Sequence, residues 1–188
     1  TIDDEYMFSI TQEIENKGNS NIEVFPYRLI KRINTPDTIN FFILHEGFIS
    51  LINDELLEKN YDDIADDCNS SMPSKKEFCD NKAQGGWLGF TDKYWMSALI
   101  PDADQSINVN YRYGNNGRDS YRAGYVGQIY KVGSGESLEY GGKLFVGAKK
   151  LNVLSAYDEK LSIPRFTDAI DWGWFSFLTK PVSYAINW

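Results

Sequence analysis

The sequence predicts a mainly β fold, a large antiparallel β-sandwich that ends in a C-terminal helical segment. Aromatic residues make up 15% of the chain, a content that is typical of β-rich proteins. Apolar and polar residues alternate with a period of two in several stretches before Gly147, and a period of three to four begins after it. The 188 residues correspond to one large domain, whose core needs neither a metal nor a disulfide to fold.

Residues 6–33 predict a β-hairpin. The apolar face of its first strand consists of Tyr6, Phe8, Ile10 and Ile14. A polar turn is expected at residues 16–20, and residues 22–33 form the second strand. After a break at Thr35-Pro36-Asp37, two further strands are expected at residues 39–44 and 48–52.

Residues 53–84 predict a long, partly ordered surface loop, because Asp, Asn, Lys and Ser dominate and the hydrophobic periodicity fades. Cys68 and Cys79 lie within it. In an oxidising compartment they could form a disulfide, which would stabilise the fold by about 2.7 kcal/mol on the chain-entropy model. The residues alone leave the oxidation state open.

Strands resume at residues 86–90 and 94–100. The clearest alternation covers residues 106–113, and the glycine-rich turn 114–117 then leads into a partner strand at 121–132. A second turn at 133–136 leads to a last strand pair that ends near Gly147. The apolar stripe of an amphipathic helix follows, formed by Leu151, Leu154, Tyr157 and Leu161, and Pro164 ends this helix.

Composition and motifs argue against several function classes. The net charge of -8 and the absence of a basic stripe argue against nucleic-acid binding. His45 is the only histidine, no nucleophile elbow is present, and we expect neither catalysis nor a bound metal or cofactor. The longest apolar run, residues 41–44, is too short to span a membrane.

Tryptophans offer two interpretations. Trp87, Trp95, Trp172 and Trp174 could line a cleft on which sugars stack, or they could fill the core of the sandwich. The candidate cleft is defined by Trp87, Tyr94 and Trp95.

Several motifs resemble the periplasmic (P1) domain of the YidC/Oxa1/Alb3 membrane protein insertase family, in its alphaproteobacterial form. Their order and spacing match this family over residues 25–188, and residues 58–84 match least. The motifs are Glu46-Gly47, residues 85–95 (GGWLGFTDKYW), 98–102 (ALIPD), 144–150 (LFVGAKK), 163–166 (IPRF), 169–175 (AIDWGWF) and 177–181 (FLTKP).

The resemblance implies a β-supersandwich related in shape to galactose-mutarotase-like proteins. Residues 1–147 would form the supersandwich, and residues 148–188 a helix and linker that pack on it and lead toward a second membrane span. The family inserts and folds inner-membrane proteins, alone or beside the Sec translocon. Because the insertion machinery lies in the membrane spans, this chain is expected to be a non-enzymatic, accessory periplasmic domain. Its implied partners are Sec components of the SecDF and SecYEG type and nascent inner-membrane proteins.

The resemblance also explains the apolar C-terminal segment, which would lie at the periplasmic membrane surface. A helix is expected to begin at residues 179–181, with Val182, Ala185 and Ile186 facing lipid. In the periplasm, the Cys68–Cys79 disulfide is favoured. The alternative function is a glycan- or peptide-binding β-sandwich module. The implied partner and membrane-interface residues are Phe166, Asp171, Trp172, Trp174, Phe175, Phe177, Lys180, Pro181 and Trp188.

Overall fold

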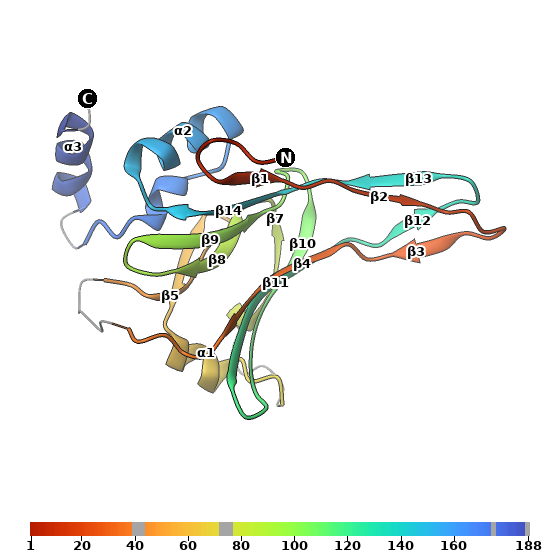
Figure 1. Cartoon of the computed structure of the whole chain (residues 1–188), viewed down its shortest axis with the longest axis horizontal. Helices are drawn as coiled ribbons and strands as arrows, with labels where there is room; N and C mark the ends of the chain where they lie inside the picture. Colours follow the sequence, from red (N-terminus) through yellow and green to blue (C-terminus); the bar gives the residue numbers. More distant parts are fainter. Residues whose placement is uncertain (39–43, 72–76, 174–175, 187–188) are drawn as a thin grey trace.

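The chain folds into a three-layered structure built on two antiparallel sheets (Figure 1). The computed structural model describes residues 1–38, 44–71, 77–173 and 176–186. The larger sheet has six strands in the order β1 (Met7–Ser9), β14 (Lys143–Ala148), β9 (Trp95–Ile100), β8 (Trp87–Thr91), β5 (Gly47–Ile52) and β6 (Glu55–Lys59). The smaller sheet has four strands in the order β4 (Tyr27–Ile33), β11 (Asp119–Gly127), β10 (Ser106–Asn115) and β7 (Asp80–Gln84).

Two hydrophobic clusters hold the layers together, one on each face of the larger sheet. Between the sheets, Phe48 and Leu88 of the larger sheet pack with Tyr111 and Tyr121 of the smaller one. The second cluster lies between the larger sheet and residues 153–169 of the C-terminal helical segment. Every residue of β5 is buried, because both of its faces are covered. The mainly β, antiparallel fold with a C-terminal helical segment is therefore confirmed.

The predicted N-terminal hairpin is wrong in its strand pairing. The turn at 16–20 joins β2 (Gln12–Glu15) to β3 (Ile22–Val24), but β2 pairs with β13 (Ser137–Tyr140) and β3 pairs with β12 (Tyr130–Val132). These two ribbons form an arm that projects from the sandwich (Figure 1). The buried side chain of Asn16 joins them, because its amide donates to the carbonyls of Ser20 and Val132 at 2.8 and 2.9 Å.

The predicted surface loop at 53–84 is also wrong. It contains β6, helix α1 (Tyr61–Asp67), the short 3-10 helix η1 (Glu77–Cys79) and β7. Asn60 caps α1, since its side-chain oxygen accepts from the backbone N–H of Asp63 at 2.8 Å. Tyr61 and Ile64 are the two residues that α1 buries, which is too short an apolar pattern to indicate a helix.

The disulfide between Cys68 and Cys79 is present, with the two Cα atoms 5.5 Å apart. It joins the end of α1 to η1, and both cysteines are fully buried in the cluster between the sheets. The disulfide that the sequence allowed between these two cysteines is confirmed, and it cross-links this region.

Most other predicted elements are confirmed with shifted ends. The β10–β11 hairpin has the expected turn, but the strand expected at 121–132 is divided into β11 and β12. The last two strands, β13 and β14, belong to different sheets. Of the strand expected at 39–44, residues 39–43 lie outside the described residues.

Helix α2 (Leu151–Leu161) is as predicted, and it ends before Pro164 at Ser162, whose φ is 52°. The 3-10 helix η2 (Phe166–Ala169) and helix α3 (Ser176–Ile186) follow. The helix expected to begin at residues 179–181 therefore begins earlier, and Pro181 lies inside it, where it removes one backbone hydrogen bond. Among the helices of the described residues, none is both long and apolar enough to cross a membrane.

Candidate functional site

The candidate site is the stretch that connects α2 to α3, beginning where it packs on the larger sheet. The fully buried Trp87 donates from its indole N–H to the carbonyl of Pro164 at 3.0 Å. The rings of Trp87 and Phe145 meet the ring of Phe166 edge-on, at centroid distances of 5.5 and 5.6 Å. Phe166, which sequence reasoning assigned to an interface, is thus a fully buried core residue that fixes the start of the stretch.

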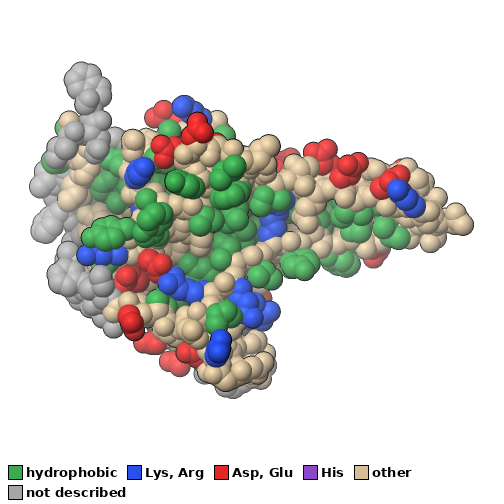
Figure 2. Space-filling model, in the orientation of Figure 1, with side chains coloured by type: hydrophobic (Ala, Val, Ile, Leu, Met, Phe, Trp, Pro, Cys, Tyr) green, Lys and Arg blue, Asp and Glu red, His purple; other side chains and the backbone are tan. Residues whose placement is uncertain are grey.

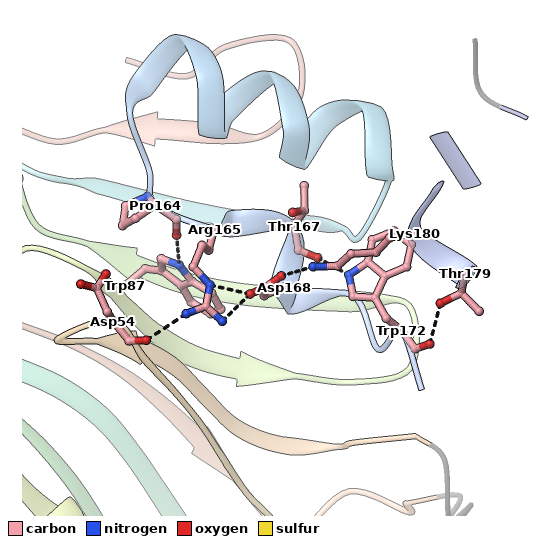
Figure 3. A network of polar contacts seen from close by, with 9 residues as sticks. All are labelled: Asp54, Trp87, Pro164, Arg165, Thr167, Asp168, Trp172, Thr179 and Lys180. Atoms are coloured by element: carbon pink, nitrogen blue, oxygen red, sulfur yellow. Dashed lines mark hydrogen bonds and ion pairs between the residues drawn. The ribbon is translucent and has the colours of Figure 1, made fainter. Parts of the chain in front are cut away.

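Asp168 connects this stretch to α3 (Figure 3). Its carboxylate accepts from Arg165 Nε at 2.8 Å and Nη2 at 2.7 Å, and from Lys180 Nζ at 2.5 Å. Only 12% of the Asp168 side chain is exposed. Arg165 also donates to the backbone oxygen of Asp54 at 2.9 Å, which ties the network to the turn between β5 and β6.

Trp172 provides two further contacts with backbone atoms of this region (Figure 3). Its indole N–H donates to the carbonyl of Thr167 at 3.0 Å, and its own carbonyl accepts from Thr179 Oγ1 at 2.9 Å. The Nζ atom of Lys180 lies 5.4 Å from the centre of the Trp172 ring, a cation–π distance. Lys180 is therefore held by an aromatic face and a carboxylate together.

The two cations decide the ionisation state of Asp168. Burial acts to raise the pKa of this carboxyl, but the hydrogen bonds and charges of Lys180 and Arg165 outweigh burial and leave its pKa below the usual range. Asp168 is therefore ionised at neutral pH, and the network keeps its charge-assisted hydrogen bonds.

Asp171 ties the same stretch to the segment before β5. Its Oδ2 atom accepts from the backbone N–H of His45 at 2.9 Å, and its Oδ1 atom accepts from that of Gly173 at 3.0 Å. Gly173 has a φ of 64°, a conformation that glycine adopts without strain. The ring of His45 lies within hydrogen-bond distance, 2.8 Å, of the carbonyl of Phe48 in β5.

The structure brings together only part of the predicted interface set. Asp171, Trp172 and Lys180 belong to the network, and Pro181 is exposed on α3. Phe177 is a residue of helix α3. Trp174, Phe175 and Trp188 lie outside the described residues.

Sequence reasoning missed the residue at the centre of the network. Arg165 and Asp168 are three residues apart, a spacing at which opposite charges meet within one helical turn. This ion pair could therefore have been predicted from the sequence. The contact between Asp168 and Lys180 joins residues that are 12 positions apart and belong to different helices, and no local pattern encodes such a pair.

The candidate cleft is not assembled. Trp87 is fully buried beneath Pro164 and Phe166, whereas Tyr94 and Trp95 are 63% and 60% exposed at the turn between β8 and β9. Trp87 belongs to the core because it faces the helical layer. Within the described residues, no three His, Cys, Asp or Glu side chains gather as metal ligands would.

These features define an antiparallel β-sandwich domain with a helical layer and an anchored C-terminal helix. The sequence profile of the YidC periplasmic domain matches residues 1–185. The chain is 38% identical over 186 residues to the membrane protein insertase YidC of Dinoroseobacter shibae, an alignment that covers 99% of this chain and 30% of that protein. It is also 38% identical over 189 residues to the YidC insertases of Methylobacterium sp. (strain 4-46) and Paracoccus denitrificans, covering 100% of this chain and 30% and 29% of those proteins.

The chain therefore belongs to the YidC periplasmic domain family, as its motifs predicted. This assigns it to the periplasmic side of an inner-membrane protein. The chain spans about 30% of the length of these curated relatives, which are insertases and not classical enzymes.

Proposed function

We propose that this domain is an accessory module of a membrane protein insertase, which holds α3 at the periplasmic membrane surface and so positions the membrane-embedded part. Family membership supports the link to insertion, and the Asp168 network supports the positioning role. Because Asp168 joins a helix packed on the sandwich to α3, the rigid domain can set the orientation of α3.

The exposed surface of α3 suits contact with lipid. Val182 is 48% exposed, and Pro181 and Ala185 are exposed as well. Lys180 precedes these residues in α3 and is paired with Asp168. An apolar face beside a basic residue is typical of helices that lie in a membrane interface.

The proposed partners are Sec translocon components and nascent inner-membrane proteins, which the domain would contact as they emerge. The insertases that resemble this chain support the second of these partners. Contact with Sec components is the more specific part of this proposal. In cells, co-purification of the insertase that contains this domain with Sec subunits tests it, and unchanged retention after deletion of the domain would remove the Sec role.

Vesicle flotation tests the role of α3. The full chain is mixed with vesicles of phosphatidylethanolamine and phosphatidylglycerol, and the bound fraction is compared with that of a Val182→Glu/Ala185→Glu variant. A charge in the interface opposes burial of the apolar face, so we expect binding to fall roughly tenfold.

Asn152→Glu/Leu161→Glu is the matched control, because both residues are exposed on α2 and the variant adds the same two charges to another helix. This control should bind as the wild type does. Equal binding by the α3 variant and the wild type would mean that α3 does not contact the membrane.

A further inference from the structure

The turn between β8 and β9 presents two aromatic side chains to solvent on otherwise buried strands. Every residue of β8 is buried, and so are Met96, Ala98, Leu99 and Ile100 of β9. Tyr94 and Trp95 are instead 63% and 60% exposed. The turn lies in the motif Thr91-Asp92-Lys93-Tyr94-Trp95, and the core uses neither of its aromatic rings.

This exposure is built into a fixed turn. The backbone N–H of Asp92 donates to the carbonyl of Trp95 at 2.8 Å, and the N–H of Lys149 donates to the carbonyl of Tyr94 at 2.8 Å. Arg32 Nη1 contacts both carboxylate oxygens of Asp92, at 2.8 and 3.0 Å, and so ties the turn to the smaller sheet. The aromatic pair is therefore held outward by contacts on both sides.

The surface around Tyr94 and Trp95 is apolar, and it carries the positively charged side chain of Lys93. Trp95 lies opposite Ala148 on β14, and Val146, which is 45% exposed, is its diagonal neighbour. Figure 2 shows hydrophobic side chains gathered on this face over β9 and β14. Lys93 Nζ lies 4.9 Å from the centre of the Tyr94 ring, and Lys93 forms no ion pair within the described part of the chain.

The turn lies on the same side of the molecule as the C-terminal stretch. Lys149 donates from Nζ to Thr91 Oγ1, at the end of β8, at 2.8 Å. Burial lowers the pKa of Lys149, and the carboxylates of Asp171 and Asp92 oppose that shift. In Figure 1 the β8–β9 turn and α3 lie at one end of the molecule, and the arm projects from the other.

We propose that the β8–β9 turn is a second membrane-surface contact, in which Tyr94 and Trp95 enter the headgroup region of the bilayer and Lys93 meets lipid phosphates. Tyrosine and tryptophan are enriched at membrane interfaces because one part of each side chain is apolar and another is polar, and lysine extends its charge to the headgroups. The proposal rests on the proposed function, since both place the domain at the membrane surface and the turn lies at the same end of the molecule as α3. Two separate contacts would fix the tilt of the sandwich on the membrane, which a single helix cannot do.

The same flotation assay tests the turn in the full chain. The test variant is Tyr94→Ser/Trp95→Ser, and Phe25→Ser/Tyr27→Ser is the matched control because Phe25 and Tyr27 are 54% and 65% exposed at the start of β4 in the other sheet. We expect the partition coefficient of the test variant to fall by roughly tenfold or more, because the variant removes two aromatic side chains from the interface. The control should bind as the wild type does.

Comparing the two variants distinguishes this inference from the proposed function. If the turn variant binds normally and the Val182→Glu/Ala185→Glu variant does not, the turn contact is wrong and the role of α3 stands. If only the turn variant loses binding, the turn contact stands and the role of α3 is wrong. A wild type that does not bind vesicles overturns both. A turn variant that keeps vesicle binding but loses a Sec subunit identifies a protein contact instead and overturns the lipid contact.

A second measurement does not depend on how well the serine variant folds. Trp95→Phe keeps an aromatic ring at the turn, so it should float as the wild type does. With brominated lipids, the wild type should show stronger fluorescence quenching than Trp95→Phe, since bromine quenches a tryptophan that lies in the bilayer. Equal quenching of the two proteins would overturn the contact.

Discussion

Asp168 shows how a single carboxylate can connect the helical layer that packs on the sheet to helix α3. Its side chain is 12% exposed and meets Arg165 on one side and Lys180 on the other. Removing it would leave both cations without their shared partner. Replacing it by asparagine keeps the shape but removes the charge, so the variant isolates the electrostatic part of the network.

The pH dependence of stability follows from the lowered pKa of Asp168. Because its pKa is lower in the folded chain than in the unfolded chain, where it is about 4, its contribution is fully present above about pH 4 and is lost as pH falls through the folded value. We expect Asp168→Asn to cost about 1–3 kcal/mol of unfolding free energy at neutral pH. Urea titrations at several pH values should show this difference shrinking below about pH 4. A difference that stays constant with pH would contradict the ionic contribution.

Leu154 tests the packing of α2 on the larger sheet. It is fully buried in the cluster that contains Trp87 and Phe145. We expect Leu154→Ala to lower the unfolding free energy by about 2–4 kcal/mol, because it leaves a cavity between helix and sheet. Leu161→Ala, at a position 37% exposed on the same helix, is the control and should cost less than about 1 kcal/mol. Equal effects would mean that α2 does not pack as described.

At the scale of elements, the disulfide fixes α1 and η1 to the smaller sheet. The N–H of Ser70 donates to the carbonyl of Tyr113 on β10 at 2.7 Å, and the N–H of Tyr113 donates to the carbonyl of Cys68 at 2.9 Å. We expect Cys68→Ser/Cys79→Ser to lose about 2–3 kcal/mol, since the unfolded chain gains the freedom of an open loop. Urea denaturation measures the loss, and hydrogen exchange should locate it in α1. Unchanged stability would show that the hydrogen bonds to β10 alone suffice.

Periodicity predicted most elements but few of their partners. The period of two located β10, strands were also expected at the positions of β5, β8 and β9, and the period of three to four located α2 with its ends. The arm was mispaired because β2 and β3 reach their partners over more than a hundred residues, and no local pattern specifies a long-range pair. Helix α1 was missed because most of its contact with the core comes from only two residues, Tyr61 and Ile64.

The sequence indicated where in the chain the candidate site lies, but not which contacts its residues make. Its stretch was recognisable from its aromatic residues, and Trp172 and Lys180 were singled out. Phe166 was assigned to an interface because an aromatic residue near a terminus has no sequence mark that separates core from surface. Its burial depends on Trp87, which lies in β8, far away in the sequence.

For the whole molecule, the larger sheet is shared by two cores. One face packs on the smaller sheet, and the other packs on α2 and η2. The helices are therefore a structural layer of the sandwich. The predicted division at residue 147 marks a change in local structure, and we expect both parts to unfold together.

Truncation tests this cooperativity. A chain ending at Lys150 loses Leu154, Ile163 and Phe166 and uncovers Trp87, which is fully buried in the whole chain. Losing such side chains costs about 2–5 kcal/mol each, so the sum approaches the entire stability of a typical domain, about 5–15 kcal/mol. We expect this chain to show no cooperative urea transition by tryptophan fluorescence and circular dichroism. A chain ending at Gly173 keeps the whole helical layer and loses only α3, so it should unfold cooperatively with a loss of about 1–3 kcal/mol, chiefly from the pair of Asp168 and Lys180. Cooperative unfolding of the shorter chain at the wild-type midpoint would instead show that the two sheets form a complete domain by themselves and that the helical layer is dispensable for folding.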